Sequence, residues 1–199
     1  MKNFILLMSL LVFPAVLISC NNKSEEKKIA PETYSRYINK GADISTEAQA
    51  ALLSNVSRAM QKGGPEYAVE FCNLQASSIV DSLNQLYNTE IGRVSAKNRN
   101  PQNDLKNDTE KELWNIMAKK IKAGKAHDTL LVMNDNLVYY KPIKTAMPAC
   151  LNCHGTAGEN INPATFEKIQ TLYPEDKATG YDLNEFRGLW KIRFLETEI

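Results

Sequence analysis

The sequence predicts an α+β domain, because helical hydrophobic patterns in its first half give way to alternating patterns in its second half. Between residues 44 and 60, apolar side chains recur every four positions, which is the spacing of one helical face. From residue 129 onward, short runs of β-branched and aromatic residues indicate strands. With 199 residues, 43% of them hydrophobic, the chain is long enough for one domain with a full core.

The first twenty residues are typical of an export signal rather than of a fold. Lys2 precedes an apolar stretch over residues 4–18 that is too short to span a membrane comfortably. Ser19-Cys20 then resembles the end of a bacterial lipobox, in which the cysteine is lipidated and becomes the new N-terminus. We expect residues 1–19 to be a lipoprotein signal peptide and Cys20 to anchor the chain to a bacterial membrane, facing the periplasm. A cleaved signal peptide with an incidental cysteine is the alternative.

A polar segment separates this signal from the domain. Residues 20–33 are charged and lack apolar periodicity, so we expect a flexible tether there and the folded domain over residues 34–199. The formal net charge is +1 and no basic cluster stands out, which argues against nucleic acid as a partner.

Two consecutive amphipathic helices are expected after the tether. Thr46 and Gln49 have the spacing of a capping box, which predicts that the first helix begins near Asp43. Its apolar stripe is Ile44, Ala48, Leu52, Val56 and Met60. Gly63-Gly64-Pro65 should end this helix. The stripe of the second helix is Ala68, Cys72, Ala76, Ile79 and Leu83.

The second half begins with a predicted loop and one more helix. Residues 92–108 are polar and rich in Asn, which predicts a long loop, and residues 110–124 have a helical pattern. Two apolar runs over residues 129–133 and 137–140 flank Asn134-Asp135-Asn136 and predict a β-hairpin.

Two further strands are expected closer to the C-terminus. Residues 143–147 are interpreted as a short strand that leads into a pair of cysteines. Trp190, Ile192 and Phe194 alternate with charged residues, as in a half-buried strand.

The segment Cys150-Leu151-Asn152-Cys153-His154 has the spacing at which c-type haem is attached. Two thiols three positions apart can bond the two vinyl groups on one porphyrin edge, and the adjacent imidazole then lies under the iron. A thioredoxin-like pair, a zinc site and a disulfide are the alternatives. The following histidine and the export signal favour haem, zinc would need further ligands, and the disulfide loop would be unusually tight. We therefore expect one covalent haem c.

The remaining cysteine, Cys72, has two interpretations. It lies on an apolar stripe, where a free cysteine behaves as a small hydrophobe. It could instead be the second axial ligand, on the haem face opposite His154. The rivals for that position are His127, Met117, Met133 and Met147.

Several motifs together resemble the PAS-like c-type haem-binding family, formerly known only as a domain of unknown function. These motifs are Ala68–Cys72, Gly92–Ser95 with Arg99–Pro101, Tyr140–Ile143, Cys150–Gly155 and Tyr173–Tyr181. The resemblance covers about residues 40 to 195 and implies a PAS-like antiparallel sheet with the N-terminal helices packed on it. It also implies one covalently bound haem with His154 and Cys72 as the axial pair. It gives no reaction and no substrate.

Three basic residues in the predicted polar loop are candidates for the haem propionates. Arginine pairs with carboxylates through two parallel hydrogen bonds, and Arg93 or Arg99 is the favoured partner, with Lys97 nearby. The alternative is that they are surface charges, or that one of them pairs with Asp104 or Asp108.

Other residues near the motif are expected to shape the haem pocket. Tyr140 and Leu151 are candidates for its apolar wall, since apolar shells tune haem sites. The segment from Tyr173 to Tyr181 is interpreted as a structural loop.

These observations lead to a hypothesis of function. We expect a membrane-anchored monohaem cytochrome that acts in electron transfer or in haem-based redox or gas sensing, with a redox or signalling protein as partner. Members of this family occur alone or are followed by signalling domains. This sequence reaches Ile199 without such a domain, so the stand-alone form is expected. A thiolate ligand should lower the reduction potential and can leave on reduction, which suits a sensor. The alternative is a peroxidase-like enzyme with a displaceable sixth ligand.

Overall fold

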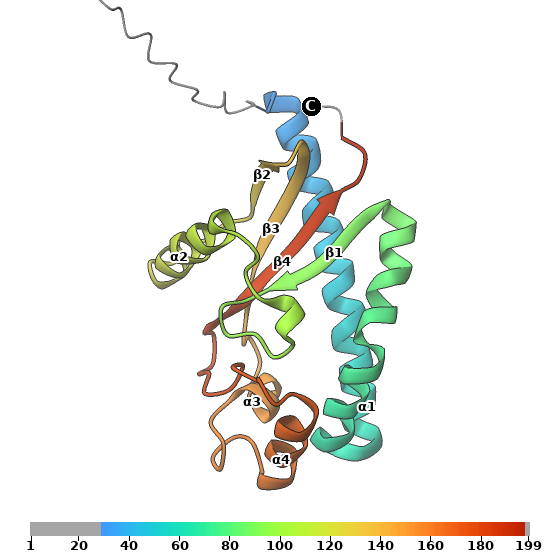
Figure 1. The fold of residues 1–199 in the computed structure, drawn as a ribbon, viewed down its shortest axis with the longest axis vertical. Helices are drawn as coiled ribbons and strands as arrows, with labels where there is room; N and C mark the ends of the chain where they lie inside the picture. Colours follow the sequence, from blue (N-terminus) through green and yellow to red (C-terminus); the bar gives the residue numbers. More distant parts are fainter. Residues whose placement is uncertain (1–28, 198–199) are drawn as a thin grey trace, which may run out of the picture.

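The computed structural model describes residues 29–197 and contains a four-stranded antiparallel sheet with helices on both faces (Figure 1). The strands are β1 (Thr89–Val94), β2 (Thr129–Met133), β3 (Asn136–Lys144) and β4 (Phe186–Phe194). The helices are α1 (Pro31–Tyr87), α2 (Asp108–Lys122), α3 (Pro148–His154) and α4 (Pro163–Leu172), with a short 3-10 helix at Pro101–Asn103. This architecture confirms the predicted α+β class and is consistent with a PAS-like fold. The expected signal peptide and Cys20 lie outside the described residues.

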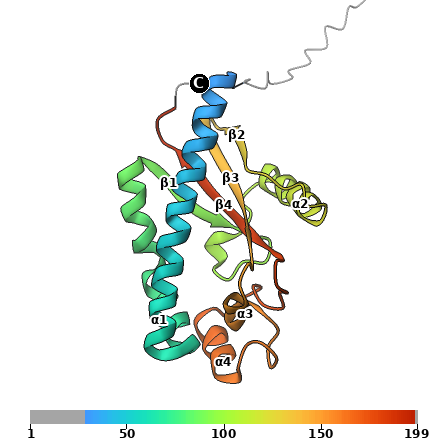
Figure 2. The same ribbon diagram turned by 180° about the vertical axis from the view of Figure 1, so that it is seen from behind.

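Helix α1 is a helical hairpin rather than one straight rod. Gly63 and Gly64 leave helical geometry, and Gly64 has a φ of 71°, which favours glycine. Pro65 follows at once, so the predicted break at Gly63-Gly64-Pro65 is confirmed. The two arms, residues 31–62 and 65–87, run side by side in opposite directions (Figures 1 and 2). Among residues 29–197, none of the helices has an apolar stretch long enough to cross a membrane.

The first arm begins at Pro31, so the prediction of a start near Asp43 was wrong. The hydroxyl of Thr46 does not cap a helix but donates to the carbonyl of Ala42, within the helix, at 2.7 Å. The helix extends further back because Tyr37 is buried in the core. Gly41 then allows close contact with the sheet, since a Cβ at this position would lie 2.3 Å from Cγ of Tyr139.

The sheet has the strand order β1-β4-β3-β2. The predicted hairpin is β2 and β3. The strand expected over residues 143–147 was partly wrong, because only its first two residues belong to β3, which ends at Lys144. Strand β4 begins at Phe186, before the predicted alternation. The expected loop over residues 92–108 was partly wrong, because its first residues belong to β1 and pair with β4. Helices α3 and α4 were not predicted.

Alternate side chains of the sheet face two different helices. Tyr139, Trp190 and Ile192 pack with Ile44, Leu52 and other residues of α1. Val138, Tyr140 and Leu189 point the other way and pack with Leu113 and Met117 of α2. A third, smaller cluster of Val69, Ile161 and Ile169 joins the second arm of α1 to α4. This last region, at the kinked end of α1, also contains α3 (Figures 1 and 2).

Candidate functional site

Helix α3 carries both cysteines and the histidine of the predicted haem motif. Pro148 occupies its first turn, and Gly155 ends it with its N–H bonded to the carbonyl of Leu151. Cys150 and Cys153 are one helical turn apart, so their side chains lie on the same side of α3. Both are free, partly buried thiols. The helix therefore presents two sulfurs together, with His154 at its end.

The ring of His154 is fixed by a backbone carbonyl. Its Nδ1–H donates to the carbonyl oxygen of Ala178 at 2.7 Å, which leaves the lone pair on Nε2. The ring of Tyr181 meets it edge to face, with centroids 6.3 Å apart. Burial, together with the charges of Arg187 and Arg99, lowers the pKa of His154 well below its usual value. A neutral imidazole with one anchored nitrogen is the form that binds a metal.

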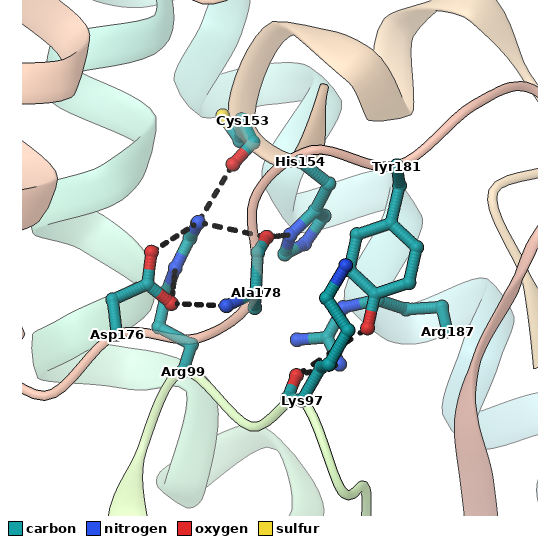
Figure 3. A network of polar contacts seen from close by, with 8 residues as sticks. All are labelled: Lys97, Arg99, Cys153, His154, Asp176, Ala178, Tyr181 and Arg187. Carbon is teal, nitrogen blue, oxygen red and sulfur yellow. Dashed lines mark hydrogen bonds and ion pairs between the residues drawn. The ribbon is translucent and has the colours of Figure 1, made fainter. Parts of the chain in front are cut away.

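Arg99 connects the segments around His154 (Figure 3). Its Nε and Nη2 donate to the two carboxylate oxygens of Asp176 at 3.2 and 3.1 Å, and the Asp176 side chain is fully buried. Nη2 also donates to the carbonyl of Cys153 at 2.6 Å and to that of Ala178 at 3.4 Å. Arg99 thus binds the same carbonyl that orients His154. Its partner is neither Asp104 nor Asp108, the two carboxylates that the sequence had suggested.

The segment from Tyr173 to Tyr181 holds the site together. The N–H groups of Gly180 and Tyr181 donate to the carbonyls of Gly155 and His154 at 2.8 and 2.9 Å. Oδ1 of Asp176 accepts from the N–H of Ala178 at 2.9 Å, which fixes the carbonyl-bearing residue in place. The segment was expected to be a structural loop, and the structure adds that it supplies the hydrogen bonds that orient the histidine.

Cys72 lies on the second arm of α1 and is partly buried. Burial raises its pKa, while Arg93 and Arg99 act in the opposite direction. Burial also raises the pKa of Cys153 to about 11, and Cys72 is among the groups whose charge contributes to that rise. One turn before Cys72, Val69 belongs to the small cluster that Cys153 packs against. The structure therefore brings Cys72 into the same site as the α3 motif.

Two further arginines lie in this site. The guanidinium of Arg93, on β1, lies over the Trp190 ring with its Cζ 5.8 Å from the centroid. Arg187, near the start of β4, donates from Nη1 to Ser95 Oγ at 3.2 Å and to the carbonyl of Lys97 at 3.1 Å. Burial lowers the pKa of Arg187 to about 10. The site is thus strongly cationic.

Several other candidates lie elsewhere. Tyr140 is buried against α2, where its hydroxyl donates to Glu110 Oε1 at 3.1 Å, so it does not join this group. Met117 and Met133 belong to the same α2-side cluster. His127 is exposed and bonds the carbonyl of Lys125, and Met147 is an exposed residue just before α3. Leu151 is partly buried on α3 itself.

Sequence reasoning missed Asp176, Tyr181 and Arg187 as site residues. A signal existed for the first two, because they belong to the segment Tyr173–Tyr181 that took part in the family resemblance. No such signal marks Arg187, which comes from the start of a strand whose alternation was recognised only from Trp190 onward.

Comparison with known proteins gives one family and one fold. The model of the family described as Tll0287-like matches residues 23–194. A solved structure entitled "Crystal structure of the cyanobacterial heme-protein Tll0287" superimposes with a TM-score of 0.61 at 18% sequence identity. The match covers 86% of this chain and 100% of the cyanobacterial one. No curated protein matches the sequence.

Proposed function

Because this chain belongs to the Tll0287-like family, we propose that it is a membrane-anchored monohaem c-type cytochrome that acts in electron transfer or in redox or gas sensing. The relationship to a haem protein indicates haem binding. The covalent attachment and the role are our proposal. One observation carries them: Cys72, Cys150, Cys153 and His154 gather in a single partly buried site.

The side chains of this site have the chemistry that haem c requires. Cys150 and Cys153 are unpaired thiols on one side of a helix, so both are free to form thioether bonds with the vinyl groups of the porphyrin. Nε2 of His154 is the free nitrogen of a neutral imidazole and would bind the iron. Cys72 would be the second axial ligand. When bound, the haem would supply one-electron redox chemistry.

The chain contributes ligand orientation and charge to this site. The Ala178 carbonyl holds the ring of His154, and Arg99 holds Ala178 and Asp176 in turn, so the imidazole cannot rotate freely. The sulfur of Cys72 would donate electron density and favour the oxidised metal, which keeps the reduction potential low. Arg93 and Arg99 lie near this sulfur and favour its thiolate form.

The membrane anchor is a separate part of the proposal and depends on sequence alone. A lipid on Cys20 would hold the domain at a bacterial membrane, facing the periplasm, through the short polar segment that precedes α1. A redox or signalling protein at that membrane would be its partner. Radiolabelled fatty acid should be incorporated by the wild type and not by Cys20→Ala.

Haem attachment is tested by acid–acetone extraction of protein matured in a host with the cytochrome c machinery. The wild type should keep its red chromophore after extraction, whereas the double variant Cys150→Ser, Cys153→Ser should lose it. A wild-type protein that retains no chromophore after maturation contradicts the proposal.

The axial ligand is tested by Cys72→Ala, with His127→Ala as the matched control. Cys72→Ala should change the ferric absorption and electron paramagnetic resonance spectra and raise the reduction potential, because a thiolate is removed from the iron. His127→Ala should change neither, since its ring is exposed and away from the site. The reverse result would move the ligand to His127. Negligible turnover of peroxide would separate a carrier or sensor from a peroxidase-like enzyme.

A further inference from the structure

The site around His154 contains more positive charge than negative charge, and its three arginines are partly buried. Arg99 bonds the Ala178 carbonyl that orients His154, and Arg187 lies by the Tyr181 ring that contacts His154. The charge of Arg93 also acts on this histidine. Asp176 is a buried carboxylate, and Arg99 binds both of its oxygens. Among the residues that the structure describes, neither Arg93 nor Arg187 forms an ion pair. A buried cation without an anion is costly, so two arginines have charge left for another group.

Arg187 has an unused donor as well as an unused charge. Its Nη1 bonds two neutral oxygens, on Ser95 and Lys97, but its Nε is buried and has no hydrogen-bond partner. Buried donors without a partner are rare in native proteins and require an explanation. The Cζ of Arg187 lies 5.5 Å from the centroid of the Tyr181 ring, which also contacts His154 edge to face. Figure 3 shows this guanidinium beside Tyr181 and close to the Lys97 backbone.

Arg93 comes from strand β1. It is paired in register with Trp190 of β4, and its guanidinium lies over the Trp190 ring. Among the charges that act on Cys72, that of Arg93 has the largest effect, and among those that act on His154, that of Arg187 has the largest effect. The two unpaired arginines are therefore associated with the two proposed axial ligands, one with each.

We propose that Arg187 and Arg93 bind the two propionate carboxylates of the haem, Arg187 from the side of His154 and Arg93 from the side of Cys72. This inference depends on the proposed function. Haem carries two carboxylates, and the chain leaves two guanidinium groups without an anion. The propionates lie on the porphyrin edge away from the vinyl groups, so Cys150 and Cys153 would not compete for them. Arginine suits carboxylates because its planar fork forms two parallel hydrogen bonds.

Arg99 is a positioning residue in this arrangement and not a propionate ligand. Its Nε and Nη2 are both committed, to Asp176, Ala178 and Cys153. The expectation from sequence was Arg93 or Arg99, with no mention of Arg187. The proposal therefore keeps Arg93, gives Arg99 a positioning role and adds Arg187.

Resonance Raman spectra of the mature, haem-loaded protein test this assignment, because the propionate bending bands respond to hydrogen bonds at the carboxylates. We expect Arg187→Gln and Arg93→Gln each to shift one or both of these bands. The same variants should raise the pH of the propionate-linked step in the reduction potential, since a lost guanidinium makes a carboxylate easier to protonate. The exposed Arg58→Gln is the control and should leave the propionate bands unchanged. Arg99→Gln is measured alongside, because the sequence had suggested Arg99 as a propionate ligand.

Each outcome decides the inference. Unchanged propionate bands in both Arg187→Gln and Arg93→Gln, with haem bound, would overturn it, and so would a shift confined to Arg99→Gln. If Arg187→Gln does not fold, Arg187→Lys keeps the charge but removes the fork, and it should still shift a band. An unshifted band in that variant counts against the inference. A wild type that binds no haem would instead refute the proposed function.

Discussion

The α2 side of the sheet and the His154 site differ in whether every buried polar group has a partner from the chain. In the first, Glu110 is fully buried and accepts from Lys191 Nζ at 2.5 Å, from Tyr140 at 3.1 Å and from the Lys106 N–H at 2.7 Å. In the second, Arg187 has a buried Nε without a partner. The chain's own atoms complete the polar network of the first region. In the second region an acceptor from outside the chain would complete the network, and a carboxylate of the proposed haem would supply one.

Apolar packing shows the same contrast. The core between the sheet and α1 contains Tyr139, Ile192 and Phe194, each at most 1% exposed. Many other buried residues pack with them. The cluster beside the proposed haem site has three buried members and is completed by partly buried residues such as Cys153. A large apolar cofactor would supply packing surface that the chain does not provide in this region.

The largest expected effect comes from shortening one isoleucine in each region. Ile192→Ala should lower the free energy of unfolding by about 4 kcal/mol and Ile169→Ala by about 2 kcal/mol, because the first leaves a cavity in a densely packed core. Both side chains are fully buried in the native protein, so exposure does not explain the difference. Urea denaturation of the mature protein measures both values. Equal losses would remove the contrast in packing.

The buried ion pair gives the second comparison. Glu110→Ala should lower the free energy of unfolding by about 3 kcal/mol, because it leaves Lys191 and the Tyr140 hydroxyl without their acceptor. The control is Glu90→Ala, which breaks the exposed cross-strand pair with Arg193 and should cost less than about 1 kcal/mol. The same denaturation curves test both variants. A loss from Glu90→Ala as large as that from Glu110→Ala would mean that burial does not set the strength of these pairs.

Elements whose hydrophobic pattern continues over several residues were predictable from sequence. The stripe from Ile44 to Met60 and the break at Gly63-Gly64 identified the first arm of α1, and the two apolar runs identified the β2–β3 hairpin. The start of α1 was not predictable, because the signal at Thr46 was a local one and the contact of Gly41 with Tyr139 joins residues far apart in the chain. Strand β1 was missed because it is short and contains a glycine and two charged residues.

The residues of the site also differ in whether a local sequence pattern could identify them. The haem motif is local and could be recognised from five consecutive residues, Cys150 to His154. The proximity of Cys72 to it depends on the turn at the glycines and on Val69 packing with Ile161 and Ile169. The environment of Arg187 depends on how β4 and the segment before it fold onto Tyr181. Sequence identifies the residue types, but partners that are distant in the chain decide which arginine pairs with a carboxylate and which stays free.

The smallest effect that we expect is a change in stability at low pH, and it again distinguishes the two regions. Burial alone would raise the pKa of Glu110, but the bonds from Lys191, the Lys106 N–H and Tyr140 outweigh it and lower the pKa below 4.5. The unfolded chain therefore takes up this proton first as the pH falls. The stabilisation is present above about pH 4.5 and is lost as the pH falls through the folded-state value.

Glu110→Gln should accordingly cost about 1 kcal/mol at pH 7, and the gap between variant and wild type should narrow between about pH 5 and pH 3. Urea denaturation at a series of pH values measures the gap, and Glu90→Gln, at an exposed pair, should show little gap at any pH. A gap for Glu110→Gln that stays constant down to pH 3 would show that the carboxylate is not stabilised as an anion. The α2 side would then resemble the part of the His154 site where, within the described residues, Arg93 and Arg187 have no charged partner.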